Sequence, residues 1–135
     1  MSALDTYTLL RADARTEIRA LTLDSRTAGE GSLFLALHGT RTDGADYAAE
    51  ALARGAVCVV TEREQTDAPC VLVPNAHEAA ARLAARWYGE PARRMSVIGV
   101  TGTNGKTTTT CLLKQLLERC LGAKVGLIGT NRNMI

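Results

Sequence analysis

The residues best suited to chemistry lie at 97–110, where the chain reads VIGVTGTNGKTTTT. Glycines in such a loop bring no Cβ and adopt backbone angles that turn successive N–H groups toward a polyphosphate. Lys106 can then reach the β- and γ-phosphates, and the Thr107 hydroxyl can bind a Mg²⁺ ion that bridges them. These residues therefore predict a site for a nucleoside triphosphate.

The glycine spacing departs from that of the generic P-loop. The generic pattern would place glycine at 100, but the chain has Val100 there, and Gly99 comes one residue too early. The alternative is a glycine-rich turn between a strand and a helix that binds nothing. We favour the nucleotide site because an apolar run, the loop, Gly-Lys-Thr and a helical pattern follow in the order that phosphate binding requires.

A strand and a helix must position this loop. The β-branched run before it predicts the strand, and leucines recur at helical spacing after Lys106 until Gly122 ends the pattern. The helix would point its N-terminal N–H groups and positive dipole end at the same anion. Residues 124–130 are expected to return as a strand parallel to residues 95–100 through a right-handed crossover. This βαβ arrangement is typical of the beginning of a P-loop ATPase-type domain.

The preceding residues predict a small, separate α/β domain. Expected strands lie at 18–23, 32–39, 56–62 and 70–74, and expected helices at 4–10, 47–54 and 75–88. Asn75 and Glu78 form a capping pair for the last helix, whose Trp87 is expected to be a core or domain-edge anchor. The run GEPARR at 89–94 breaks the helical pattern. We place the first domain at 1–90, a linker at 91–94 and a second, incomplete domain at 95–135.

Composition argues against several functional classes. With 46% hydrophobic and 22% charged residues, the 135-residue chain can bury a core. A net charge of +2, with no basic cluster larger than Arg93 and Arg94, argues against nucleic-acid binding. The N-terminus has no long apolar segment, so we expect neither a signal peptide nor a membrane partner, and a cytoplasmic protein.

The four cysteines are Cys58, Cys70, Cys111 and Cys120. No C-x-x-C pair occurs among them, and each falls inside an expected strand or helix. We therefore expect small buried residues in a reducing compartment rather than disulfides or zinc ligands. His38 and His77 have no carboxylate or cysteine partner at useful spacing and are expected to be structural.

Two separated stretches resemble the muramyl ligases of peptidoglycan synthesis. The first is similar to the N-terminal domain of those ligases through LDSR at 23–26, GSLFLAL at 31–37, Asp43-Gly44 and ARGA at 53–56. The second, GVTGTNGKTT at 99–108, is similar to the ATP loop of the same ligases and of folylpolyglutamate synthetase. The run GLIGT at 126–130 favours the ligases that add the third residue over those that add the terminal dipeptide.

This resemblance implies a cell-wall enzyme that uses ATP and Mg²⁺ to join an amino acid to UDP-N-acetylmuramoyl-L-alanyl-D-glutamate through an acyl phosphate. The implied ATP contacts are Gly102, Thr103, Asn104, Gly105, Lys106, Thr107 and Thr108, with Lys106 catalytic and Thr107 at the metal. Leu23 and Ser25 would contact the uridine nucleotide, and Thr40, Arg41 and Thr42 would line its diphosphate. Short hydroxyls, loop N–H groups and an arginine suit such a dianion.

Two features limit how much of the family's site the resemblance assigns to this chain. Thr40 and Arg41 stand where the family usually has His or Gln, and an ordinary turn built on Asp43-Gly44 is the alternative for this loop. An acidic Mg²⁺ ligand, a modified lysine and the domain that selects the amino acid would lie beyond position 135. We therefore expect the chain alone not to turn over, and these residues leave the added amino acid open.

Three other functions remain alternatives. The first is a non-catalytic module that binds a UDP-sugar or another nucleotide, and the second is the related ligase that adds the terminal dipeptide. The third is a P-loop GTPase or kinase, which is disfavoured because no DxxG follows the loop. The oligomeric state is left open.

Overall fold

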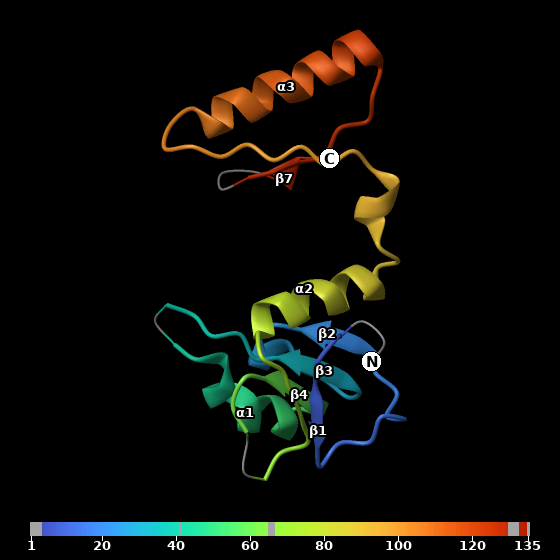
Figure 1. Cartoon of the computed structure of the whole chain (residues 1–135), viewed down its shortest axis with the longest axis vertical. Coiled ribbons are helices and arrows are strands. Elements are labelled where there is room, and N and C mark those ends of the chain that lie inside the picture. The colour runs from blue at the N-terminus through green and yellow to red at the C-terminus, as the bar shows by residue number, and fades with distance from the viewer. Residues whose placement is uncertain (1–3, 41, 65–66, 130–132, 135) are drawn as a thin grey trace. The chain divides into compact units, whose positions relative to one another are not determined.

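The computed structural model describes residues 4–40, 42–64, 67–129 and 133–134 (Figure 1). The chain divides into two compact units, Met1–Arg94 and Met95–Ile135, and each is described by itself. The elements of the first unit are β1 (Thr8–Leu10), β2 (Ala20–Thr22), the 3₁₀ helix η1 (Ser25–Thr27), β3 (Ser32–Leu35), the 3₁₀ helix η2 (Gly44–Tyr47), α1 (Ala48–Ala53), β4 (Ala56–Thr61), β5 (Cys70–Leu72), α2 (Ala76–Trp87) and the 3₁₀ helix η3 (Pro91–Arg94).

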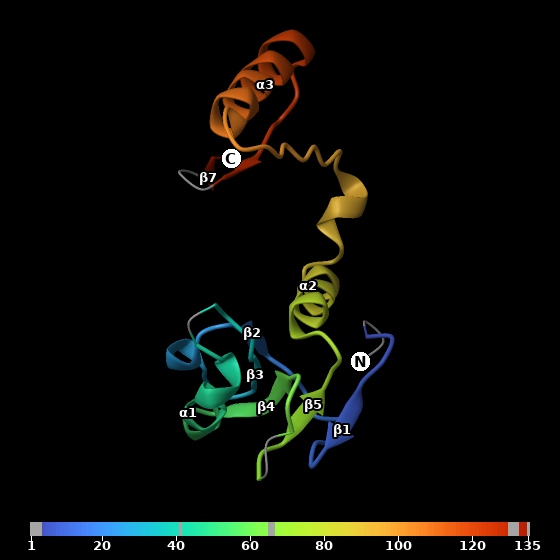
Figure 2. The ribbon, with the colours of Figure 1, turned by 60° about the vertical axis from the view of Figure 1, so that its left-hand side comes forward.

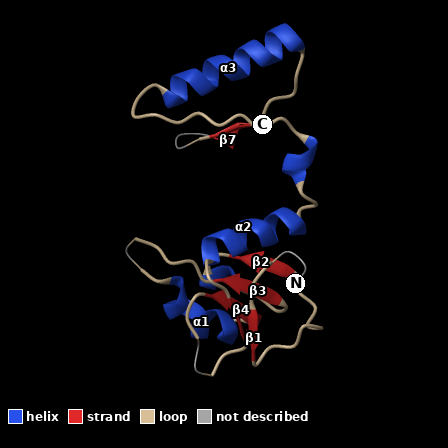
Figure 3. Cartoon of the chain, in the orientation of Figure 1, coloured by secondary structure: helices blue, strands red, loops and turns tan. Residues whose placement is uncertain are grey.

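The first unit is a five-stranded sheet between two helical layers. The strand order is β1-β5-β4-β3-β2, in which β2, β3, β4 and β5 run parallel and β1 runs antiparallel to β5. Helix α1 packs on one face and α2 on the other, so that the strands lie between the helices (Figure 3). The mixed α/β architecture expected for this part of the chain is confirmed.

Alternate side chains of β3 and its neighbours make two buried clusters. The cluster under α2 contains Leu33, Leu35, Cys58, Val60, Val71, Val73, Ala76, Ala79 and Ala80. The cluster under α1 contains Phe34, Ala36, Ala48, Ala51, Ala56, Val59 and Cys70. Because both faces are covered, the central strands are apolar at successive positions rather than at alternate ones. The strands expected from these runs are confirmed, and each is shorter than expected.

The expected helix at 4–10 is wrong. Residues Thr8–Leu10 form β1, in which Thr8 pairs with Leu72 and Leu10 with Cys70. Figure 2 shows β1 beside β5 at one edge of the sheet. Leu9 also packs against the α2-side cluster. Backbone hydrogen bonds to β5 and burial of Leu9 therefore decide the structure of a segment whose local helical preference is weak.

The helix with the predicted capping pair is confirmed. The Asn75 side chain accepts a hydrogen bond of 2.9 Å from the Glu78 amide and begins α2. Within the described part of the chain, the Glu78 side chain makes no reciprocal bond back to the Asn75 amide. Instead, it accepts a hydrogen bond of 2.7 Å from Arg82, one turn further along the helix. Trp87, the expected anchor, is the last residue of α2 and is exposed.

The second unit consists of α3 (Lys106–Leu121), β6 (Leu127–Ile128) and β7 (Asn133–Met134). The predicted strand at 95–100 is wrong, because residues 95–105 belong to no helix or strand. The predicted parallel partner is also wrong, because β6 pairs antiparallel with β7, with Ile128 opposite Asn133. Thr130, the last residue of the predicted 124–130 strand, lies outside the described residues.

The expected pairing is absent although its connection is present. Helix α3 supplies the crossover that a parallel pair requires. The side chains of Val97 and Ile98 are 72% and 57% exposed, so the 95–100 run lacks the burial that stabilises a strand. Among the described residues, Leu127–Ile128 pair with Asn133–Met134 instead.

Two of the four cysteines are buried as expected. Cys58 and Cys70 lie in the core, Cys111 is partly buried and Cys120 is exposed on α3. The expectation of burial is thus wrong for Cys120, because α3 presents this side to solvent. Among the described residues, no helix is both long and apolar enough to span a membrane.

Candidate functional site

The predicted phosphate loop forms an open turn at the start of α3. Gly102 and Gly105 have φ angles of +142° and +76°, which favour glycine because other residues carry a Cβ. Gly105 immediately precedes the helix, and its carbonyl accepts the hydrogen bond of 2.9 Å from the Thr109 amide that closes the first turn. No side chain caps this end and no acidic residue lies in the first turn. Its N–H groups are therefore available to an anion.

Lys106 lies over its own loop. Its ammonium group donates a hydrogen bond to the carbonyl oxygen of Gly102, on the other side of the turn. Thr107, next to it, is exposed, whereas the Thr110 hydroxyl donates to the helix carbonyls of Lys106 and Thr107, at 3.0 Å each. All seven residues of the predicted loop are exposed: Gly102, Thr103, Asn104, Gly105, Lys106, Thr107 and Thr108.

The residues at this turn fit a Mg²⁺ ion that is shared with a nucleotide. Within the described ranges, no group of three or more His, Cys, Asp and Glu side chains could hold a metal by itself. The exposed Thr107 hydroxyl offers one oxygen ligand of the hard type that Mg²⁺ prefers. Phosphate oxygens would complete such a site, as they commonly do for Mg²⁺ in enzymes that transfer phosphoryl groups.

The residues predicted to bind the uridine nucleotide gather at one edge of the sheet in the first unit. Leu23 and Ser25 directly follow β2, and the 36–43 loop follows β3. These strands are neighbours and run parallel, so their carboxyl ends meet at the same edge. In parallel α/β sheets, ligands bind outside the carboxyl ends of the strands. The fold thus brings together two stretches that are separated in the sequence.

The loop after β3 is a closed turn. The Gly39 amide donates to the Thr42 carbonyl at 3.0 Å, and the Gly44 amide donates to the Leu37 carbonyl at 2.9 Å. A Cβ on Gly44 would lie only 2.6 Å from the Leu37 oxygen, so the turn requires glycine there. Thr40 and Thr42 are exposed, and Arg41 lies outside the described residues.

Asp43 anchors the base of this turn. Its carboxylate accepts a hydrogen bond of 2.9 Å from the Ala45 amide and lies 3.1 Å from an Arg63 nitrogen. The Ala45 amide, with the nearby Arg63 charge and a hydrogen bond from His38, lowers the pKa of Asp43. Arg63 also bonds to Asp46 at 3.1 Å. These contacts hold the turn in one position beside β4.

The turn borders a cavity of about 360 Å³. Its lining residues are Ala36, His38, Asp43, Thr61, Glu62 and Arg63. Glu62 and Arg63 follow β4, so they extend the same carboxyl edge of the sheet. Sequence analysis did not single out these two residues, because neither belongs to a motif.

The two histidines have structural contacts. His77 shares a hydrogen bond of 2.9 Å with the carbonyl oxygen of His38. The His38 Nδ1 atom lies 3.6 Å from the Asp43 carboxylate, so the expectation that His38 has no carboxylate partner is wrong. The turn brings these residues together as an isolated β-bridge, which their spacing along the chain does not reveal.

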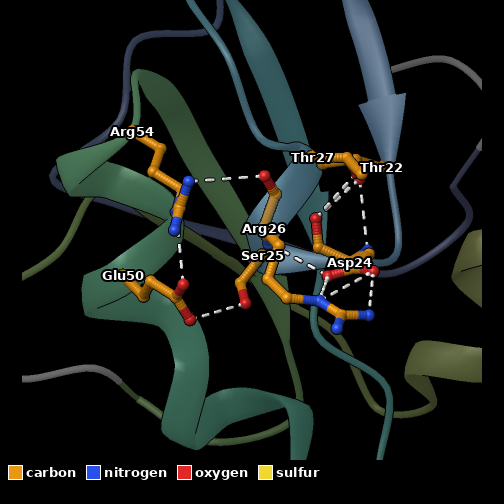
Figure 4. Close-up of polar contacts among 7 residues, drawn as sticks. All are labelled: Thr22, Asp24, Ser25, Arg26, Thr27, Glu50 and Arg54. Carbon is orange, nitrogen blue, oxygen red and sulfur yellow. Dashed lines mark hydrogen bonds and ion pairs between the residues drawn. The ribbon is translucent and has the colours of Figure 1, made fainter.

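The segment after β2 is held by polar contacts (Figure 4). Asp24 caps η1 by accepting from the Arg26 amide at 3.0 Å, and the Arg26 guanidinium bonds to both carboxylate oxygens. Arg26 thereby lowers the pKa of Asp24 to about 2. Leu23 is 62% exposed, whereas Ser25 is only 7% exposed and donates to Glu50 at 2.8 Å.

Comparison with known proteins supplies the family. Residues 17–88 match the family described as "Mur ligase family, catalytic domain", and residues 100–135 match "Mur ligase middle domain". One curated relative is the UDP-N-acetylmuramoyl-L-alanyl-D-glutamate--2,6-diaminopimelate ligase of Geobacillus kaustophilus (strain HTA426), 51% identical over 84% of this chain and 23% of its own length. Another is the UDP-N-acetylmuramyl-tripeptide synthetase of Roseiflexus sp. (strain RS-1), 50% identical over 84% of this chain and 23% of its own length.

Solved structures agree with this assignment. A UDP-N-acetylmuramoyl-L-alanyl-D-glutamate--2,6-diaminopimelate ligase matches with a TM-score of 0.72 and 27% identity over 93% of this chain and 26% of its own. The MurF ligase of Thermotoga maritima in complex with ADP matches with a TM-score of 0.56 and 37% identity over 76% of this chain and 23% of its own. The chain spans about a quarter of the length of the curated relatives it matches. The chain belongs to the Mur ligase family.

Proposed function

We propose that this chain is the N-terminal part of an ATP-dependent ligase of peptidoglycan synthesis that joins an amino acid to UDP-N-acetylmuramoyl-L-alanyl-D-glutamate. The observation that carries the proposal is the likeness to relatives of that name, which extends over 84% of the chain at 51% identity. The relative's name makes 2,6-diaminopimelate the first amino acid to test. Because ATP is a substrate, we also propose the cytoplasm as the place of action.

In this proposal, the second unit binds ATP. The uncapped start of α3 offers N–H groups to the phosphates, and Lys106 exchanges its hydrogen bond to Gly102 for bonds to phosphate oxygens. ADP bound to the MurF ligase of Thermotoga maritima supports a nucleotide site in this family. Thr107 would hold Mg²⁺, which supplies positive charge between the anionic reactants.

The reaction joins two anions and then forms an amide. An oxygen of the substrate carboxylate attacks the γ-phosphorus of ATP, and the bond from that phosphorus to the β,γ-bridging oxygen breaks, which yields an acyl phosphate and ADP. The amine of the incoming amino acid then attacks the acyl carbon and releases phosphate and a proton. Lys106 and the loop N–H groups lower the barrier to the first step by stabilising negative charge on the phosphoryl group.

The first unit binds the uridine end of the other substrate in this proposal. Leu23 contacts the nucleotide, and Thr40, Arg41 and Thr42 line the diphosphate. Ser25, also expected to contact the nucleotide, is only 7% exposed and donates to Glu50, so we assign it to holding the segment in place. The position of 23–25, Thr40 and Thr42 after neighbouring parallel strands supports this assignment. The exposed Leu23 side chain offers an apolar surface to a flat base, and the hydroxyls of Thr40 and Thr42 can donate to phosphate oxygens.

Calorimetric titration of the chain tests the proposal. Separate titrations with UDP-N-acetylmuramoyl-L-alanyl-D-glutamate and with Mg²⁺-ADP are expected to give one site each, and saturation with one ligand should leave the affinity for the other unchanged. Binding of the uridine ligand without ADP would favour a non-catalytic nucleotide-binding module. Binding of neither ligand would contradict the proposal.

A related ligase that adds the terminal dipeptide is the second candidate. The MurF ligase of Acinetobacter baumannii matches with 35% identity and a TM-score of 0.60 over 78% of this chain and 23% of its own. The length of the bound peptide separates the two candidates. Tighter binding of the UDP-N-acetylmuramoyl-tripeptide than of the dipeptide form, by the full-length ligase of which we propose this chain is a part, would favour the dipeptide-adding function.

A further inference from the structure

We propose that Glu50 is a positioning residue for the uridine nucleotide. From α1, its carboxylate holds the 23–26 segment, defined as Leu23, Asp24, Ser25 and Arg26, in the conformation that receives the ligand. This inference rests on the proposed function of the first unit and adds to it a residue that does not itself contact the substrate.

The Glu50 carboxylate uses its two oxygens for two different partners (Figure 4). The Ser25 hydroxyl donates to Oε2 at 2.8 Å, and the Arg54 Nε donates to Oε1 at 3.2 Å. Arg54 is one helical turn beyond Glu50, and their pairing fixes the Glu50 side chain. Arg54, the residue that ends α1, therefore helps to direct the Glu50 carboxylate at Ser25.

A second, longer contact closes a ring between α1 and η1. Arg54 Nη1 lies 3.5 Å from the carbonyl oxygen of Arg26, the residue after Ser25. Glu50 thus bonds to the side chain of Ser25, and Arg54 approaches the main chain of Arg26. Together they connect α1 to two successive residues of the 23–26 segment.

The segment needs such an attachment because its own structure is short. Helix η1 has only three residues, Ser25–Thr27, and 3₁₀ helices of this length have poor hydrogen-bond geometry. Asp24, Arg26, Thr22 and Thr27 bond among themselves, so these contacts shape the segment without joining it to α1. Among the contacts drawn in Figure 4, those to Glu50 and Arg54 are the ones that join the segment to α1 and to the residue that ends it.

The contrast between Leu23 and Ser25 gives the attachment a function. Leu23 is 62% exposed and is predicted to contact the nucleotide, whereas Ser25, two residues later, is 7% exposed. The buried hydroxyl anchors the segment while the leucine faces solvent. A segment that is already ordered loses less conformational entropy when its ligand binds, so the affinity is higher.

Substitutions at Glu50 distinguish the effect of side-chain length from the effect of side-chain charge. Glu50→Gln keeps the side-chain length and an acceptor oxygen for Ser25 but removes the charge. Glu50→Asp keeps the charge but shortens the side chain by one methylene, which withdraws the carboxylate from Ser25. If the hydrogen bond to Ser25 positions the segment, Gln preserves binding better than Asp does. A general electrostatic role of the carboxylate, including its interaction with the dipole at the start of α1, predicts the opposite order.

Calorimetry of the 135-residue chain with UDP-N-acetylmuramoyl-L-alanyl-D-glutamate measures the effect. We expect about tenfold weaker binding for Glu50→Ala and Glu50→Asp, and a change below about threefold for Glu50→Gln. Glu78→Ala is the control, since Glu78 also pairs with an arginine four residues later, on α2. It should leave the affinity unchanged. Thermal unfolding of each variant, followed in parallel, establishes that the chain is folded at the titration temperature.

The outcomes distinguish this inference from the function on which it rests. Failure of the unsubstituted chain to bind overturns both. Normal binding by the unsubstituted chain together with unchanged affinity in Glu50→Asp overturns the positioning role alone. Equal losses in Glu50→Ala and Glu78→Ala, or weaker binding by Gln than by Asp, also overturn it. If Glu50→Ala does not fold, the comparison of Gln with Asp still decides.

Discussion

The Lys106 ammonium group donates a hydrogen bond to the carbonyl oxygen of Gly102, four residues earlier in the same loop. Gly102 has φ +142°, and Gly105, between them, has φ +76°. The lysine therefore lies across a turn whose backbone conformation favours glycine. In this position the ammonium group bonds to a loop carbonyl in place of the phosphate oxygens that we propose as its partners.

Lys106→Ala is expected to remove the charge that pairs with the nucleotide phosphates. Binding of Mg²⁺-ADP should weaken at least about tenfold, since charge-assisted hydrogen bonds to phosphate are lost. Binding of the uridine ligand should be unchanged, because that site belongs to the first unit. Calorimetry with each ligand measures both effects, and Lys124→Ala is a control on an exposed lysine of the same unit. Equal weakening of the two ligands would contradict separate sites.

Gly55→Ala is expected to destabilise the first unit by about 2–3 kcal/mol. Gly55 follows α1 with φ +108°, and a Cβ there would lie 2.8 Å from the Glu30 amide nitrogen. Gly29→Ala is the control, because a Cβ at that position meets nothing within 4 Å, and it should change the free energy of unfolding by less than about 0.5 kcal/mol. Denaturant unfolding followed by the fluorescence of Trp87, the single tryptophan, measures both. Similar values for the two variants would contradict the close approach of Gly55 to Glu30.

The Asp24 carboxyl should make folding sensitive to acid. Hydrogen bonds from Arg26 lower its pKa from the ordinary 3.8 to about 2 in the folded chain. A lowered folded-state pKa means that the ionised form contributes stability above about pH 4, and that this contribution is lost as the pH falls toward 2. Asp24→Asn should therefore be less stable at pH 7 and lose less stability between pH 4 and 2.

An NMR titration of the carboxyl group tests the cause of this shift. In Arg26→Ala, the Asp24 pKa should return toward its ordinary value, because the side-chain hydrogen bonds from Arg26 are the largest contribution to the shift. An unchanged Asp24 pKa in that variant would rule out the pair as the origin of the acid sensitivity.

The cysteines should differ in their rates of alkylation. Cys120 is exposed and should react first, and the partly buried Cys111 should react more slowly. Cys58 and Cys70 are buried, and burial raises the pKa of the Cys58 thiol to about 11, so little thiolate is present. Mass spectrometry of the labelled chain gives the order. Rapid labelling of Cys58 without unfolding would contradict its place in the core.

Local patterns predicted the elements whose signals are local. The buried strands β3 and β4 follow from uninterrupted apolar runs, and α2 begins at Asn75, whose side chain was expected to cap it. The loop at 102–108 could be identified because its glycines, Lys106 and the helix are contiguous. These features depend on residues that are close in the chain.

Features that depend on distant partners could not be predicted in the same way. β1 exists because Thr8–Leu10 pairs with β5, whereas the expected strand at 95–100 has no such partner among the residues that the structure describes. The bond from Ser25 to Glu50 joins residues 25 positions apart, and no motif relates them. The 3.6 Å approach of His38 to Asp43 likewise depends on the turn between them.

Phosphate release by the full-length enzyme, of which we propose this chain is the N-terminal part, tests the ligase assignment most directly. The assay combines UDP-N-acetylmuramoyl-L-alanyl-D-glutamate, Mg²⁺-ATP and 2,6-diaminopimelate or another diamino acid, and mass spectrometry identifies the product. We predict one phosphate released for each UDP-N-acetylmuramoyl-tripeptide formed, and no release by the Lys106→Ala variant. Absence of phosphate release with every diamino acid, from a protein that binds both ATP and the uridine substrate, would contradict the assignment.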